Sequence, residues 1–266
     1  MTSSAGNTAV LDLPQVTLVA VSSVNIAATV QAMMASCKHI RFAACKLLTH
    51  TPPCKVPDGI EVIEVPEIAS ASAYSQFMLG SLADHITTSH CLIVQWDGHV
   101  IRPEMWDQRF LEYDYIGASW PQFTDGHDVG NGGFSLRSRK LIEACSAPQF
   151  AQSHPEDVAI GRVNRDWLES RGMKFAPRSM ADCFSAERAG SAEHSFGYHG
   201  VWHMPGMLGV DEFWHIYQSL DDKTSVFHDL GYIIRQIISR PAGLRRSMRL
   251  AADWLGQRLG QKFGQR

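Results

Sequence analysis

Two segments of the chain carry residues whose types and spacing could do chemistry. The first, VGNGGFSLRSRKLIEAC, contains Gly132 and Gly133, and glycines let the backbone come close to a ligand because they have no Cβ. The second, PEDVAIGR, contains Glu156 and Asp157 at the expected start of a helix. A carboxylate beside a ligand cleft can accept a proton from a substrate hydroxyl. Together the segments indicate an enzyme that handles a polar substrate.

Asp97 is a third candidate because it directly follows an apolar run. The sequence CLIVQ, expected to form a central strand, leads into Trp96-Asp97-Gly98-His99. A carboxylate at the end of such a strand can hold a divalent cation or a ribose hydroxyl. An Asp-Gly pair taken alone more often forms only a turn. The position of Asp97 at the end of a strand favours the binding role.

The pattern of apolar residues predicts a nucleotide-binding type of α/β sheet in the first half of the chain. Expected strands are 16–24, 41–48, 60–65 and 91–95, with helices following Asn25 and at 71–86. In sheets of this class ligands collect beyond the carboxyl ends of the strands. Ser22 and Ser23 would then share one crevice with Asp97, where they would bind a nucleotide or only cap the next helix.

The second half of the chain is less regular. The pattern predicts a strand at 134–136, a helix at 137–145, one long helix at 158–172 and a short strand at 181–185. The expected division of the chain is a loose leader at 1–14, a catalytic domain at 15–215 and a basic helical tail at 216–266.

Composition excludes several classes of protein. With 266 residues, 45% of them hydrophobic, the chain can bury a large core. A net charge of −3 argues against a nucleic-acid partner. The six cysteines form no CxxC pair, and no signal peptide and no apolar run of about 18 residues is present. We therefore expect a cytoplasmic protein.

The last 32 residues differ in character from the rest. Between Arg235 and Arg266 there are eight basic residues and one acid, Asp253, and apolar residues recur at helical spacing. A basic amphipathic helix can lie on an anionic membrane surface. Two interpretations of this tail are open: it associates peripherally with the inner face of the membrane, or it is a solvated helix that packs on protein.

Taken in order, the motifs resemble those of GT-A-fold glycosyltransferases. The sequences are WDGH, YDYIGASW, GNGGFSLRSRK, PEDVAIGR and FGYHG. More narrowly, the chain resembles a bacterial glycosyltransferase-like family catalogued as a domain of unknown function, over residues 16–204. The resemblance implies a GT-A-like, Rossmann-like central mixed sheet flanked by helices.

The resemblance also implies a metal site. GT-A enzymes use a short acidic motif after a central strand to hold Mn²⁺ or Mg²⁺ on the diphosphate of a nucleotide-sugar, and Asp97 matches that position. His199 resembles the late histidine that completes the site. This chain departs from the family pattern because WDGH replaces the two-carboxylate DxD motif.

The other matching positions concern the two substrates. Gly132 and Gly133 match the glycines that line the donor sugar and acceptor, and Arg137 would meet phosphate unless it is a solvated helix start. Asp157 matches the carboxylate that acts as catalytic base in inverting families, with Glu156 as the second candidate. Both acids would also suit the first turn of a helix.

The function implied is transfer of a sugar, with inversion, in polysaccharide biosynthesis. The donor would be a nucleotide-sugar, expected to be a UDP-sugar, and the acceptor a saccharide or a glycolipid. The alternative is a non-catalytic nucleotide- or carbohydrate-binding protein on the same fold, since fold does not imply function. Glycoside hydrolysis is a weaker alternative because no second acid is obviously paired with Asp157.

Overall fold

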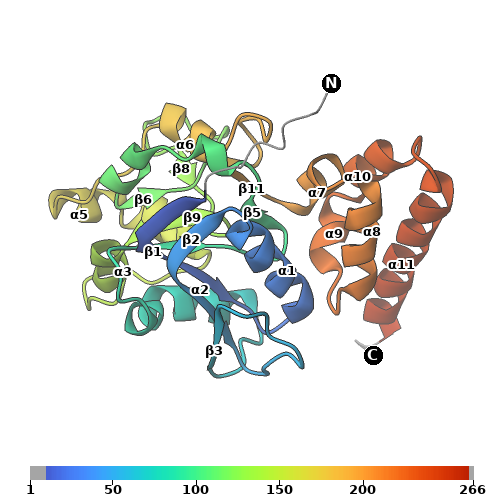
Figure 1. Cartoon of the computed structure of the whole chain (residues 1–266), viewed down its shortest axis with the longest axis horizontal. Coiled ribbons are helices and arrows are strands. Elements are labelled where there is room, and N and C mark those ends of the chain that lie inside the picture. The colour runs from blue at the N-terminus through green and yellow to red at the C-terminus, as the bar shows by residue number, and fades with distance from the viewer. Residues whose placement is uncertain (1–9, 264–266) are drawn as a thin grey trace. The chain divides into compact units, whose positions relative to one another are not determined.

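A computed structural model describes residues 10–263 and the side chains of residues 10–259 (Figure 1). The chain divides after His199 into two compact units, and each is described by itself. Residues 1–9 of the expected leader lie outside the described residues. The rest of that segment is not loose, because the first strand begins at Leu11 and Leu13 is buried.

The first unit is built on a six-stranded sheet with the order β3-β2-β1-β4-β9-β6. The strands are β1 (Leu11–Val21), β2 (Ile40–Thr49), β3 (Ile60–Glu64), β4 (His90–Ile93), β6 (Tyr115–Ile116) and β9 (Ser135–Ser138). The first four are parallel, whereas β9 is antiparallel to both β4 and β6. The expected α/β fold with a central mixed sheet flanked by helices is confirmed.

Alternating side chains of β1 explain why helices cover both faces of this sheet (Figure 1). Leu18 packs in a buried cluster with Val30 and Met33 of α1 (Ile26–Cys37). Val19 packs on the other side with Met78 of α2 (Ala71–Gly80). The ends of the strands are thereby held in a rigid frame.

Two smaller sheets and several short helices complete the unit. The small sheets pair β7 (Ala118–Ser119) with β8 (Val129–Gly130), and β5 (Gly98–Val100) with β11 (Gly197–His199) and β10 (Ser185–Ala186). The further helices are η1 (Leu82–His85), η2 (Pro103–Met105), η3 (Gln108–Glu112), α3 (Arg139–Cys145), α4 (Glu156–Val158), η4 (Ala159–Val163), α5 (Arg165–Ser170) and α6 (Arg178–Phe184).

Two expected elements of the second half are wrong. The long helix expected at 158–172 is interrupted by the π-helical turn η4. Within that turn Gly161 lies against the carbonyl oxygen of Val129 and the Trp120 ring, with no room for a Cβ without adjustment. The strand expected at 181–185 is mostly helix α6, in which Ala181 and Phe184, three positions apart, are both buried. That spacing suits one face of a helix.

The second unit is helical. Its elements are η5 (Val201–His203), α7 (Met204–Met207), α8 (Val210–Ser219), α9 (Thr224–His228), α10 (Leu230–Ile237) and α11 (Gly243–Phe263). Its buried apolar residues come from several helices, among them Phe213, Ile233 and Leu250. Within the described part of the chain, no helix combines the length and apolarity required to cross a membrane.

Candidate active site

The topology of the large sheet brings the segment after β4 and the segment before β9 to the same edge. Because the two strands are antiparallel, Ile93 at the end of β4 pairs with Ser135 at the start of β9. The residues that follow β4 include Asp97, and those that precede β9 include Gly132 and Gly133. The carboxyl end of β1 lies at this edge too, since β1 is parallel to β4.

The small sheet adds His199 to Asp97. In the antiparallel pair of β11 and β5, His199 lies opposite Gly98, the residue after Asp97. The imidazole Nε2 of His199 is 3.6 Å from Asp97 Oδ1 and 3.2 Å from Gln95 Oε1. The two residues that the sequence assigned to a metal site are therefore neighbours, and both side chains are largely buried.

Glu187 belongs to the same cluster, although the sequence did not reveal it. Strands β10 and β11 are parallel, with Ala186 opposite Tyr198, so Glu187 reaches the level of His199. Glu187 Oε1 lies 3.2 Å from His199 Nδ1. The strand before Glu187 has only two residues and no apolar run that would reveal it in the sequence. The pairing of β10 with β11 is what brings this carboxylate close to His199.

The acids around His199 control its protonation. Burial alone would lower the pKa of this imidazole, but Asp97, Glu187 and Asp157 outweigh that effect and raise the pKa to about 9. With no ligand present, His199 is consequently a cation at neutral pH.

Gly132 and Gly133 separate two groups of side chains and touch both. A Cβ on Gly133 would overlap the His199 imidazole, and a Cβ on Gly132 would overlap the Glu156 carboxylate. The turn is set by Asn131, which has φ of 69° and accepts a hydrogen bond from the Gly133 amide through Oδ1 at 3.0 Å. Asparagine is one of the few residues that tolerate this left-handed conformation. The glycine pair thus forms a tight turn and also allows close approach.

Arg137 and Glu156 form a buried ion pair behind the glycines. Arg137 Nη2 donates to Glu156 Oε1 at 3.1 Å, and its Nε donates to Ser135 Oγ at 3.1 Å. The guanidinium is fully buried in β9 and lies over the Tyr115 ring, so Arg137 is not a solvated helix start. Its Nη1 is buried and has no hydrogen-bond partner among the described residues.

A serine of α2 fixes the loop that carries Glu156. Ser75 Oγ accepts a hydrogen bond from the Glu156 backbone amide at 3.1 Å. The same hydroxyl lies 2.8 Å from His154 Nδ1. Glu156 is therefore anchored from both α2 and β9, through its backbone and its side chain.

Of the two adjacent acids, Glu156 is paired with Arg137, whereas Asp157 forms no ion pair with a basic side chain among the described residues. Burial and the nearby Glu156 carboxylate raise its pKa to about 6. One of its oxygens, Oδ1, accepts a hydrogen bond from the Val158 amide at 2.8 Å. A carboxylate with a pKa close to neutral is well suited to accept a proton in a reaction.

Ser22 and Ser23 lie at the carboxyl end of β1, at the same edge of the sheet. Their contacts are local: Ser23 Oγ accepts a hydrogen bond from the Ile68 amide at 2.8 Å, and Ser22 Oγ donates to the Val24 carbonyl oxygen. Asn25 stands at the N-cap of α1 but makes no capping hydrogen bond with its side chain. A nucleotide role for the two serines stays a prediction.

The residues around His199 fit a divalent cation with few protein ligands. Asp97 Oδ1, His199 Nε2 and Gln95 Oε1 converge on one small region. Oxygen donors suit Mg²⁺ and Mn²⁺, and an imidazole is compatible with Mn²⁺. The remaining positions would be left to phosphate oxygens and water.

A second group of potential metal ligands lies elsewhere in the first unit. The ligand atoms of His127, Asp166 and Glu169 are within 4.8 Å of one another, and both carboxylates are exposed. Exposed acids gather in this way without a metal, so we assign this group no function.

Residues 59–199 match the family described as "Protein of unknown function (DUF5672)", which is more than half of the chain. The protein therefore belongs to that family. The matched region ends at His199, where the first compact unit also ends. A search of curated protein sequences found no match.

Solved glycosyltransferase structures are similar to the chain at low identity. The mannosyltransferase PcManGT from Pyrobaculum calidifontis, in complex with GDP-Man and Mn²⁺, has 11% identity and a TM-score of 0.38, over 62% of this chain and 56% of that one. The apo-form glycosyltransferase GlyE of Streptococcus pneumoniae TIGR4 has 13% identity and a TM-score of 0.39, over 76% and 50%.

A glycosyltransferase involved in glycosylation of the major capsid of PBCV-1 is also similar, with 12% identity and a TM-score of 0.43 over 76% of this chain and 98% of that one. The matches span about half the length of the first two structures. Scores of this size carry no argument about activity.

Proposed function

We propose that the protein is a GT-A-like glycosyltransferase that moves a sugar from a nucleotide-sugar, expected to be a UDP-sugar, to a saccharide or lipid-linked acceptor. The observation that carries the proposal is the position of the Gly132–Gly133 turn. One glycine touches His199, which neighbours Asp97, and the other touches Glu156, which precedes Asp157. A donor-binding group and a proton acceptor would thereby serve one cleft.

Asp157 is the proposed base. Its carboxylate would take the proton from an acceptor hydroxyl while the hydroxyl oxygen attacks the anomeric carbon, and the bond from that carbon to the diphosphate would break. Direct displacement of this kind inverts the configuration of the anomeric carbon. Glu156 is already paired with Arg137, which supports a positioning role for both residues.

Asp97 and His199 are the proposed metal ligands. A divalent cation bound there would neutralise charge on the departing diphosphate. His199 is held by Glu187 through the other ring nitrogen, and such a contact orients an imidazole for ligation.

The test is consumption of a panel of nucleotide-sugars by the purified chain, with Mn²⁺ and a mixture of saccharide and glycolipid acceptors. We expect one donor to be consumed, with loss of turnover but nearly unchanged donor binding in Asp157→Asn. Asn keeps the size of the side chain and cannot act as a base. Full activity of that variant would refute the assignment of Asp157.

The second candidate function is ligand binding without catalysis. It is favoured by the ion pair of Asp97 with His199, because these side chains satisfy each other without a cation. This candidate predicts that a nucleotide-sugar raises the melting temperature equally with and without Mn²⁺ and is recovered intact.

A further inference from the structure

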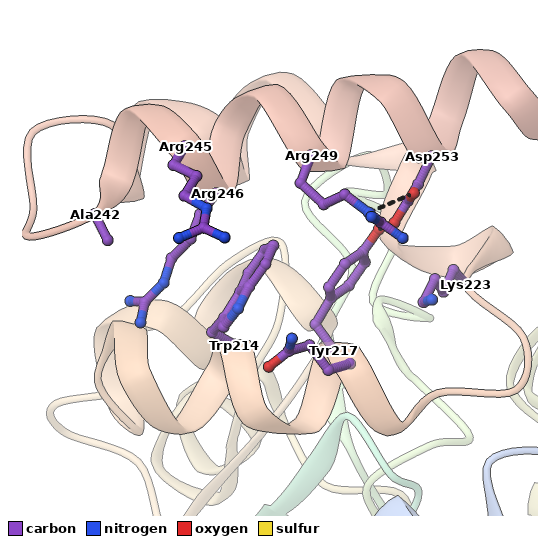
Figure 2. A pocket seen from close by; sticks show the side chains of 9 residues that line it. Trp214, Tyr217, Lys223, Ala242, Arg245, Arg246, Arg249 and Asp253 are labelled. Atoms are coloured by element: carbon purple, nitrogen blue, oxygen red, sulfur yellow. Dashed lines mark hydrogen bonds and ion pairs between the residues drawn. The ribbon is translucent and has the colours of Figure 1, made fainter.

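The helical second unit contains a cavity with an unusual concentration of positive charge. Its volume is about 480 Å³, within the range of small-molecule sites. It lies between α8 and α11 (Figure 2). Four cations and one acid are among the residues that line it: Lys223, Arg245, Arg246, Arg249 and Asp253.

The carboxylates around the cavity neutralise only part of this charge. Asp253 Oδ1 lies 2.9 Å from Arg249 Nε, and its other oxygen accepts a hydrogen bond from Tyr217 at 2.8 Å. Asp211, which is almost fully exposed, lies 2.6 Å from Arg246 Nη2. Among the residues that line the cavity and their ion-pair partners, two acids therefore meet four cations.

Three cationic groups are left with donors to spare. Lys223 and Arg245 have no ion-pair partner among the described residues, although Lys223 lies 5.0 Å from the centre of the Tyr217 ring. Arg246 Nη1 is buried without a hydrogen-bond partner in the described part of the chain. Arg246 thus adds positive charge to the cavity wall, while Lys223 and Arg245, which are at least partly exposed, offer donors that a ligand can reach.

The opposite wall of the cavity is aromatic. Trp214 and Tyr217 rise from α8 toward the arginines of α11 (Figure 2). Their rings are stacked, with centroids 5.2 Å apart, and the Arg246 guanidinium lies over Trp214 at 5.6 Å. Such a wall offers an apolar surface to whatever group is attached to an anion.

We infer that this cavity is a binding site for a phosphate-bearing ligand, held by Lys223, Arg245 and Arg246. Guanidinium groups bind phosphate with paired hydrogen bonds, and lysine adds a point charge. A carboxylate ligand would offer fewer acceptor oxygens and less charge. All the lining residues belong to the second unit, so the inference does not depend on the proposed function of the first.

The test is calorimetric titration of the full chain with inorganic diphosphate, at low salt and with EDTA to remove metal-dependent binding. We expect binding by the wild type and a loss of affinity of at least about tenfold in the double variant Lys223→Gln/Arg245→Gln. Arg245 is exposed and Lys223 is partly so, and circular dichroism will show that the fold is intact.

A matched control variant isolates the cavity. Arg235→Gln/Arg258→Gln removes the same charge from exposed positions outside this cavity. It should bind diphosphate as the wild type does. No binding by the wild type, or an equal loss in both double variants, would overturn the inference.

Vesicles separate two sources of the phosphate. If a lipid headgroup is the ligand, the wild type will sediment with phosphatidylcholine vesicles that contain phosphatidic acid, and diphosphate will compete with the vesicles. Of the variants, only Lys223→Gln/Arg245→Gln, here called the cavity variant, will stay in solution. If a free phosphate compound is the ligand, the cavity variant will lose diphosphate binding but sediment with vesicles to the same extent as the wild type.

Discussion

The imidazole of His199 lies against Gly133 and occupies the space that a Cβ on Gly133 would need. The two residues come from different sheets, because Gly133 precedes β9 of the large sheet and His199 ends β11 of the small one. Their contact brings the two sheets together at the candidate active site. A glycine is therefore needed here for packing, whatever the ligand.

A methyl group at this position should disturb both stability and function. We expect Gly133→Ala to lower the free energy of unfolding by about 1–3 kcal/mol, because the new Cβ forces His199 to move. Urea denaturation will measure the change. Gly80→Ala is the matched control, since a Cβ at Gly80 meets no atom within 4 Å. Equal unfolding midpoints for the two variants would show that the close contact has no energetic weight.

Removing the charge of Glu156 should be much more costly than removing that of an exposed acid. Glu156→Gln leaves the fully buried Arg137 guanidinium without its counter-charge, and we expect a loss of about 3–5 kcal/mol. The control is Glu143→Gln, which breaks the exposed pair of Glu143 with Arg139 and should cost about 0.5 kcal/mol or less. A Glu156→Gln protein as stable as the control would mean that Arg137 is hydrated in solution.

The raised pKa of Asp157 should make stability depend on pH. Its pKa is about 6 in the folded protein against an ordinary value of 3.8, so the folded state binds the proton more tightly than the unfolded state does. The contribution of Asp157 to the free energy of unfolding therefore falls as the pH rises from about 4 to about 6.

Asp157→Asn removes this contribution. The variant should gain stability over the wild type across that interval, by an amount on the order of 3 kcal/mol at pH 7. Thermal unfolding of both proteins between pH 4 and pH 8 measures the difference. A difference that does not change with pH would contradict the raised pKa.

The same group should set the acid limb of the activity profile. If Asp157 is the base, kcat/KM will fall below about pH 6, where its carboxylate becomes protonated. The profile is measured with the donor found in the nucleotide-sugar panel. A limb near pH 4 would point to a carboxyl group with an ordinary pKa, and no limb at all would exclude Asp157 as the base.

Mn²⁺ binding should depend on Asp97. Electron paramagnetic resonance of Mn²⁺ titrated with the protein and the nucleoside diphosphate should show a bound ion in the wild type and at least about tenfold weaker binding in Asp97→Asn. Asp166→Asn is the control, because Asp166 belongs to the exposed group with His127 and Glu169. Loss of the bound ion in the control alone would move the metal site to that surface.

Local patterns in the sequence were sufficient to predict the framework of the first unit. The apolar run that became β4 and the polar residues after it were enough to place Asp97 at a strand end, because a buried strand has a recognisable composition. The Gly132–Gly133 pair was also visible, since adjacent glycines are rare outside turns and close approaches.

The rest of the cluster depends on contacts between distant residues. Glu187 follows a strand of only two residues, too short to leave a pattern, and it reaches His199 through the pairing of β10 with β11. Arg137 was expected to meet phosphate or to start a solvated helix, yet it lies in β9, paired with β4 and β6, and its side chain is buried. In the π-helical turn η4, Gly161 likewise lies against Trp120, a residue distant in the sequence.

The hydrogen bond from the Glu156 amide to Ser75 joins residues that are 81 positions apart. It makes α2, a helix with no proposed chemical role, part of the support for the acids. In a library of random variants scored for activity, substitutions along the inner face of α2 should therefore appear as inactivating ones. The positions at which substitutions inactivate the protein will therefore include residues that do not contact the substrate.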